Sequence, residues 1–336
     1  MIRFTWMQFR IQALVALCGL AIVAVVLGLT GPSLVHLYDT SKFATCGAHG
    51  DCSTITNGLL SHDRLLQDLS SVLLAVPALI GLFWGAPLVA REFETGTFRL
   101  VWAQGVTRTR WMAIKLAIVG LASMAVAGLL SLLVTWWSSP LDRVNPNQFS
   151  TLFAERGIVA IGYAAFAFAL GVTAGLLIRR TLPAMVTSLI GYVVVRLGVT
   201  KLRPHFQAPL TLREKLATGA HGIVQSVPGG GAAPPPHLGD WVLSSDVLSA
   251  SGQPFNQAKI ACSIFVRPGE SASSAHSAAS ACLAHARAYS AGLRDVVTFQ
   301  PSSRYWPFQW YETAIFIGLA AVLGCFCLWW IRRSVS

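Results

Sequence analysis

Six long apolar runs limit what this 336-residue chain can fold into. Each run has about 17–25 residues, and a helix of that length crosses the roughly 30 Å hydrocarbon core of a bilayer. Only 12% of the residues are charged, about half of the roughly 25% that is usual in soluble domains. We therefore predict an all-α polytopic membrane protein with six transmembrane helices. The runs are Ala13–Leu29, Val72–Ala90, Ala113–Trp136, Gly157–Ile178, Leu182–Leu202 and Ala314–Ile331.

The distribution of Lys and Arg around these runs predicts their orientation. Loops on the cytoplasmic side of membrane proteins carry an excess of basic residues. The basic-rich flanks hold Arg3, Arg10, Arg91, Arg99, Arg108, Arg110, Lys115, Arg179, Arg180, Arg332 and Arg333, whereas the other short flanks hold Lys42, Arg64, Arg143 and Arg156. We predict that both termini are cytoplasmic in a multi-pass protein of the plasma membrane. The net charge of +11 then faces anionic membrane lipids and requires no nucleic-acid partner.

The order of the runs predicts four parts. Residues 1–12 read as an interfacial amphipathic helix, or alternatively as the start of the first span. Residues 13–202 hold spans one to five and a cytoplasmic loop at 91–110. Residues 203–308 are long enough for an extracellular domain. Residues 309–336 form span six and a cytoplasmic tail.

The long outer segment is expected to be a small α/β extracellular domain between spans five and six. It opens with a helix candidate at Leu210–Ala220. Residues 241–248 and 260–266 resemble strands, and Ser271–Leu293 resembles an Ala-rich helix. Residues 138–156, in contrast, are expected to form a short outer loop.

Four of the seven cysteines fall outside the apolar runs. An oxidising exterior favours two short-range disulfides, Cys46–Cys52 and Cys262–Cys282. The competing interpretation is a zinc site at Cys282 with His276 and His285. We do not expect one, because no Cys-x-x-Cys pair is present.

Small residues and prolines mark close contacts and bends within the runs. The Gly-x-x-x-Gly motifs at 81–85 and 171–175 let helices approach closely, more plausibly within one chain than between two copies. Pro77 and Pro87 are expected to kink span two.

Arg196 is the only clear charge that the sequence places inside the membrane. Such a charge reads by default as a gate or a substrate counter-charge. The alternative is a long side chain that snorkels to the outer face. Glu155 and Glu312, near the outer ends of spans four and six, are its possible partners.

Residues 90–115 form a charged, moderately amphipathic stretch between two apolar runs. Such a segment can lie on the membrane and offer its polar face to a cytosolic partner. The alternative is an ordinary basic loop with interfacial aromatic residues. This stretch contains three short motifs: Arg91-Glu92-x-Glu94-x-Gly96-Thr97-x-Arg99, then Thr107-Arg108-x-Arg110-Trp111, then Lys115.

These motifs resemble the inner-loop signature of type-two ABC exporter permeases, most closely the actinobacterial ones. The resemblance implies six spans, cytoplasmic termini, an interfacial N-terminal helix and an inner loop that acts as a coupling helix on a separate ATPase. It also implies two ATPase subunits, which bind ATP and Mg, and two permease copies, here a homodimer. The chain itself contains no Walker A sequence and is not expected to be an enzyme or to bind a cofactor or metal.

The resemblance assigns coupling to particular residues. Gly96 permits a sharp turn after span two. Glu92 and Glu94 are expected to accept from basic groups on the ATPase or from Arg91 and Arg99, and their removal should affect coupling more than folding. The predicted coupling residues are Arg91, Glu92, Glu94, Gly96, Thr97, Arg99 and Arg108.

The sequence thus predicts the permease subunit of an ATP-driven exporter. The expected substrate is a hydrophobic or amphipathic small molecule, such as a drug, an antibiotic or a lipid, that passes outward through a dimer interface. Two alternatives are a membrane sensor with an extracellular ligand-binding domain and a stand-alone secondary transporter. The spans lack the chain of Asp, Glu and His residues typical of proton coupling.

Overall fold

A computed structural model shows the chain as two units, a helical one and a smaller one. The helical unit comprises Met1–Phe206 and Tyr305–Ser336, and the smaller unit is Gln207–Arg304. The structure describes residues 2–40, 73–96, 107–139, 149, 151–215, 239–249, 252–254, 280–281, 284, 288 and 292–333.

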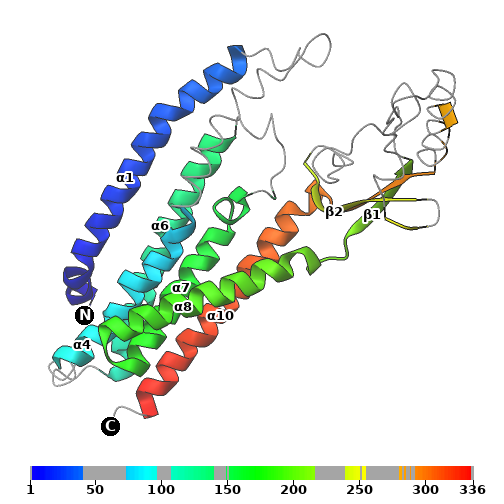
Figure 1. The fold of residues 1–336 in the computed structure, drawn as a ribbon. Helices are drawn as coiled ribbons and strands as arrows, with labels where there is room; N and C mark the ends of the chain where they lie inside the picture. Colours follow the sequence, from blue (N-terminus) through cyan, green and yellow to red (C-terminus); the bar gives the residue numbers. More distant parts are fainter. Residues whose placement is uncertain are drawn as a thin grey trace, which may run out of the picture. The chain divides into compact units, whose positions relative to one another are not determined.

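Among the described residues, the helical unit contains six helical segments that are long and apolar enough to cross a membrane, the number that the sequence predicts. Both chain termini lie at the same end of this unit (Figure 1). The side of the membrane on which that end lies stays a prediction. The segments are α1 (Ile2–Thr40), residues 73–80 with η1 (Gly81–Gly85) and α4 (Ala86–Thr95), α6 (Arg108–Ser138), α7 (Val159–Ile178), α8 (Thr181–Leu202) and α10 (Tyr305–Arg333).

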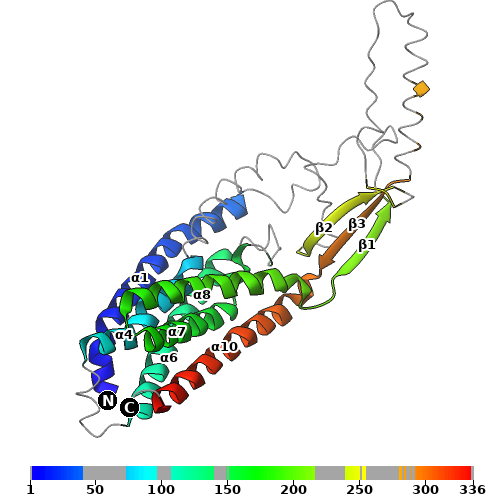
Figure 2. The same ribbon diagram turned by 60° about the horizontal axis from the view of Figure 1, so that its bottom comes forward.

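Helix α7 is the centre of the helical unit. It packs against α10, α8, α6, α4 and η1, and sixteen of its 20 residues are buried. Its neighbours surround it in Figures 1 and 2. Ala and Gly occupy many of its positions, and small side chains let several helix backbones approach one helix at once.

Two of the glycine motifs meet face to face at this centre. A Cβ atom on Gly171 would lie 2.3 Å from the carbonyl oxygen of Gly81, and one on Gly81 would lie 2.6 Å from that of Ala167. No side chain fits at such distances. The prediction that these glycines pack within one chain is confirmed.

Span two is irregular where it packs against the glycines of α7. Its η1 turn is π-helical, and Pro87 follows in the first turn of α4. Pro87 has no N–H to donate to the Phe83 carbonyl, as a regular α-helix would require. The Gln12 side chain of α1 donates to this carbonyl instead, with Nε2 at 3.2 Å from the oxygen. A replacement donor matters because an unpaired carbonyl is costly in lipid.

Helix α1 is also held to the unit further along its length, at Leu27 and Thr30. Leu27 packs on Trp137 of α6, whose Nε1 donates to Thr30 Oγ1 at 3.0 Å. The helix runs without a break from Ile2, so residues 2–12 are helical and continuous with the span. Whether they lie at an interface stays a prediction.

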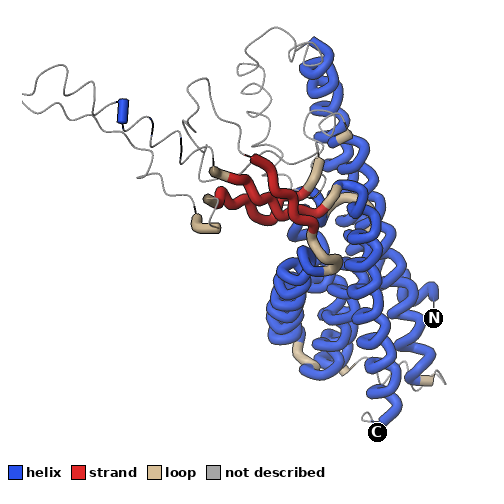
Figure 3. Tube along the Cα trace, turned by 90° about the vertical axis from the view of Figure 1, so that its right-hand side faces the viewer, coloured by secondary structure: helices blue, strands red, loops and turns tan. Residues whose placement is uncertain are grey.

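The smaller unit contains an antiparallel three-stranded sheet in the order β1-β3-β2 (Figure 2), whose strands are red in Figure 3. The strands are β1 (Leu210–Lys215), β2 (Trp241–Leu248) and β3 (Arg294–Gln300). The central strand, β3, supplies buried Val297 and Phe299 to a small core.

The sheet corrects part of the sequence prediction. The expected helix at Leu210–Ala220 is wrong where the structure describes it, because residues 210–215 are β1. Leu, Arg, Glu and Lys favour helices locally, but pairing with β3, as between Leu212 and Val297, overrides that preference. The strand predicted at 241–248 is confirmed as β2.

Other predictions for the parts of the chain between the spans fall partly or wholly outside the described residues. These are the strand at 260–266 and the four cysteines of the two proposed disulfides. Within Ser271–Leu293, residues Ser280, Ala281, Ala284 and Ala288 are helical, as predicted.

Candidate functional site

A buried ion pair joins the two helices that flank the predicted coupling loop. Lys115 Nζ of α6 lies 2.5 Å from Glu92 Oε1 of α4, and the two residues are 1% and 7% exposed. The same ammonium donates to the Leu88 carbonyl at 3.3 Å and lies 4.7 Å from the centre of the Trp111 ring. Buried Glu92 is therefore bound to Lys115, and the expectation that it accepts from an ATPase needs correction.

Glu94 connects the same region to a third helix. Its Oε1 accepts from the Thr181 N–H at 2.9 Å, and its Oε2 accepts from the Thr181 hydroxyl at 2.5 Å. Thr181 is the first residue of α8, so Glu94 caps that helix from outside and complements its dipole. One residue beyond α4, Gly96 adopts the left-handed conformation with φ 72°, which makes the turn that the sequence predicts.

A fourth helix reaches this end of the unit. Thr107 caps α6, with its hydroxyl accepting from the Arg110 N–H at 3.4 Å. Arg332 of α10 donates from Nε to Thr109 Oγ1 at 3.3 Å. Helices α4, α6, α8 and α10 thus meet where residues 97–106 attach.

The remaining predicted coupling residues have different positions. Arg91 is exposed and Arg108 is half-buried. Thr97 and Arg99 lie outside the described residues. Arg179, which follows α7, places its guanidinium 5.5 Å from the centre of the Phe93 ring of α4.

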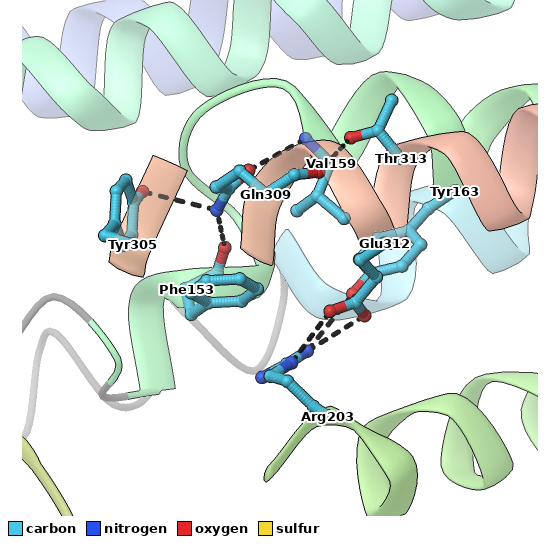
Figure 4. A network of polar contacts seen from close by, with 8 residues as sticks. All are labelled: Phe153, Val159, Tyr163, Arg203, Tyr305, Gln309, Glu312 and Thr313. Carbon is cyan, nitrogen blue, oxygen red and sulfur yellow. Dashed lines mark hydrogen bonds and ion pairs between the residues drawn. The ribbon is translucent and has the colours of Figure 1, made fainter. Parts of the chain in front are cut away.

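The opposite end of the helical unit contains a second buried ion pair (Figure 4). Arg203, just after α8, binds the Glu312 carboxylate of α10 with two bonds, Nε to Oε2 at 2.8 Å and Nη2 to Oε1 at 3.0 Å. The Tyr163 hydroxyl of α7 donates to the same carboxylate. The Arg203 guanidinium also lies 4.2 Å from the centre of the Phe153 ring. Glu312 of α10 is 0% exposed, and its carboxylate contacts Tyr163 of α7 and Arg203 at the end of α8.

Gln309, one helical turn before Glu312, holds a folded-back segment against α10. Its Oε1 accepts from the Val159 N–H at 3.0 Å, and its Nε2 donates to the Phe153 carbonyl at 2.9 Å (Figure 4). Phe153 belongs to a 3₁₀ turn, η3 (Thr151–Ala154), and is buried together with nearby Phe149. Residues 149 and 153–156 of the expected outer loop at 138–156 are therefore packed into the unit.

Arg196 lies inside the unit, two turns before Arg203. Its Nη1 donates to the Leu74 carbonyl at 3.0 Å and to the Tyr192 hydroxyl at 2.9 Å. Its guanidinium stacks 4.5 Å from the centre of the Tyr163 ring. Snorkelling is thus not the arrangement found, and Glu312, one of the two expected partners, binds Arg203 instead. The expectation that Arg196 is the only clear charge within the spans is also wrong, since Lys115 and Glu312 are buried there.

Glu155, the other expected partner, shares a small cleft with Arg196. Apart from Ser131, the described residues that line the cleft with them are apolar. Glu155 is 7% exposed, and its Oε2 has no hydrogen-bond partner among the described residues. Burial raises the pKa of this carboxyl from its ordinary 4.5 to about 8, against the opposing effect of Arg196.

Helix α8 connects the two ends of the helical unit at which these charged residues lie, which we call its polar ends. It begins at Thr181, which binds Glu94, and about 22 Å further along its axis it presents Arg196. Sequence reasoning missed the Glu92–Lys115 and Arg203–Glu312 pairs. The available signal was a charged residue at or just beyond the end of each of four apolar runs, because a charge that lies inside a membrane requires a partner there.

These features define a multi-pass helical membrane protein whose charge pairs join its helices at both ends. Among the described residues, no group of three or more His, Cys, Asp or Glu side chains is placed to hold a metal ion.

A family model described as "ABC-2 membrane transporter related" matches residues 17–203, which is more than half of the chain. The chain belongs to this family. Its members are typically non-catalytic membrane subunits that work with a cytosolic ABC ATPase. No curated protein and no solved structure matches the chain.

Proposed function

We propose that this chain is the permease subunit of an ATP-driven exporter in the plasma membrane, with residues 91–110 as its contact with the ATPase. The observation that carries the proposal is the meeting of four helices where residues 97–106 attach. Glu92–Lys115 joins α4 to α6, and Glu94 joins α4 to α8. A force applied to the segment between α4 and α6 would therefore act on α8 as well.

The proposed mechanism follows this connection. Nucleotide binding and hydrolysis occur in two partner ATPase subunits, which hold ATP and Mg. Movement of residues 97–106 tilts α4 and α6 and, through Glu94, the start of α8. Because α8 carries Arg196 and leads directly into Arg203, the same movement acts on the polar network at the opposite end. Two copies of the chain would move a hydrophobic or amphipathic small molecule outward between them.

The direct test is assembly with an ATPase. The tagged chain is co-expressed with ABC ATPase subunits from the same organism and purified, and the ATPase turnover is measured alone and in the complex. The proposal predicts a stable complex with altered turnover. Retrieval of a kinase and no ATPase would contradict the proposal and favour a sensor.

Two matched variants on α8 test the proposed coupling route, which runs from residues 97–106 through Glu94 to α8. Thr181→Val removes the hydroxyl that donates to Glu94, and Thr200→Val makes the same change at an exposed site near the far end of the helix. We expect Thr181→Val to reduce ATPase stimulation by about fivefold or more, because fivefold corresponds to the lower limit of typical coupling free energies. We expect Thr200→Val to leave the stimulation unchanged. The thermal stability of both variants should stay close to that of the parent chain. Equal stimulation in the two variants would rule out this route.

A further inference from the structure

A groove of about 570 Å³ separates the middle of α1 from the rest of the helical unit. Its walls come from residues 11–23 of α1, residues 73–84 of span two, and Val126 and Leu130 of α6. Among the described residues that line it, all but Gln12 are apolar or aromatic. The volume lies within the roughly 300–1,000 Å³ range of small-molecule sites.

The groove exists because α1 is held to the unit on either side of it. Gln12 binds the Phe83 carbonyl at one end, and Thr30 binds Trp137 beyond the other end. Between them, a Cβ atom built on Gly19 would meet no atom within 4 Å. Val15, which lines the groove, is 69% exposed, so the groove is open to the side.

The position and length of the groove indicate what reaches it. All its walls belong to candidate membrane spans, so the groove opens into lipid hydrocarbon and not into water. From Ile11 to Val23 the helix rises about 18 Å. One leaflet contributes about 15 Å to the hydrocarbon core, which is half of its thickness. The groove therefore matches the extent of one acyl chain.

A positive charge marks one end of the groove. Arg10 is exposed and directly precedes the first lining residue, at the start of the α1 span. Long Arg side chains at helix ends extend to the interface, where the phosphates of anionic lipids attract them. We propose that the groove binds one acyl chain of an anionic phospholipid from the leaflet nearest the N-terminus, with Arg10 at its phosphate. This inference does not depend on the proposed exporter function.

The test is photo-crosslinking of the full chain in phosphatidylcholine nanodiscs. Trace phosphatidylglycerol or phosphatidylcholine carries a diazirine in the middle of its acyl chain, and labelled peptides are mapped by mass spectrometry. We expect phosphatidylglycerol to label residues 11–23 and 73–84 several-fold more than the other exposed faces of the helices. Uniform labelling of exposed faces, or no labelling here because a second copy of the chain covers the groove, would overturn the proposal.

Two glycines of α1 provide matched variants. Gly19→Trp fills the groove, whereas Gly28→Trp adds the same side chain at an open site outside it. Groove labelling should fall at least fivefold in Gly19→Trp and stay unchanged in Gly28→Trp; an equal effect of both would refute the site. Gly19→Leu serves if Gly19→Trp does not fold, and it should also reduce labelling.

Arg10→Gln tests the headgroup separately. It should lower labelling by phosphatidylglycerol and leave labelling by phosphatidylcholine unchanged. Equal loss with both lipids, or no loss with either, would overturn the assignment of an anionic lipid.

Discussion

The buried charges of Lys115 and Glu312 are tolerated inside the spans because both have partners from other parts of the chain. Lys115 has Glu92, and Glu312 has both Arg203 and the Tyr163 hydroxyl. Taking an ion out of water costs several kcal/mol unless a counter-charge and hydrogen bonds compensate for it. Each pair therefore specifies which helices meet, and removing one member leaves the other buried and uncompensated.

The Arg203–Glu312 pair provides a stability prediction. Glu312→Gln keeps the shape of the side chain but leaves the Arg203 charge without its carboxylate. We expect a loss of about 3–5 kcal/mol, which is typical of a broken buried pair. The measurement is the thermal unfolding of the purified chain in detergent micelles. The double variant Arg203→Met/Glu312→Leu removes both charges and should recover most of the loss; if it is as unstable as Glu312→Gln, the cost does not come from the uncompensated charge.

The raised pKa of Glu155 leads us to predict that the stability of the chain depends on pH. Its pKa is about 8 in the folded chain and near 4.5 when unfolded. Between these values the folded state holds more protons than the unfolded state, so stability falls as pH rises through this window. Arg196 is the one other charged residue among the described residues that line the cleft.

Glu155→Gln should remove this part of the pH dependence. We expect the unfolding temperatures of the parent and the variant to be similar at pH 5, and the parent to become the less stable of the two by pH 9. Thermal melts across this range measure the difference. A constant difference at all pH values would show that Glu155 does not titrate in the window.

At the scale of the element, the sequence predicted what depends on local composition. The six spans follow from apolar length, and the close contact of Gly81 with Gly171 follows from the absence of side chains there. Strand β1 was mistaken for a helix because its partner, β3, lies about 80 residues further along the chain.

The same limit applies to the candidate site. The stretch that holds Glu92 and Glu94 was recognisable from its motif. Their partners were not, because Lys115 and Thr181 come from other helices whose rotation and level a sequence pattern does not specify. Arg196 was noticed as a charge within a span, but its contact with the Leu74 carbonyl depends on how two distant helices pack.

The packing of α7 gives a prediction about a whole element. Gly171→Ala places a methyl group 2.3 Å from the Gly81 carbonyl oxygen, and backbone atoms cannot rotate away as a side chain can. The helices must separate, and we expect a loss of about 3 kcal/mol, at the upper end of typical overpacking costs. Gly318→Ala, at an exposed site on α10 with no atom within 4 Å, is the control and should be neutral. Thermal unfolding in micelles compares the two variants. Equal stability would mean that α7 and span two do not approach each other as closely as Gly171 and Gly81 do in the structure.

For the molecule as a whole, the proposed function requires the two polar ends of the helical unit to face opposite sides of the membrane. Helix α8 runs from Thr181 to Leu202, directly before Arg203, so one helix connects both ends. An ATPase reaches residues 97–106 only if they lie on its side. The excess of Lys and Arg at that end predicts the cytoplasm.

Cysteine labelling tests this orientation. Arg110→Cys, exposed near the start of α6, and Ser303→Cys, exposed just before α10, are compared with the parent chain, whose native cysteines set the background. With a membrane-impermeant maleimide, we expect Ser303→Cys to react on intact cells and Arg110→Cys to react only in inverted vesicles. The two positions lie at opposite ends of spans, so each serves as a control for the other. Reaction of Arg110→Cys on intact cells would place residues 97–106 outside, where no cytosolic ATPase can act on α4, α6 and α8.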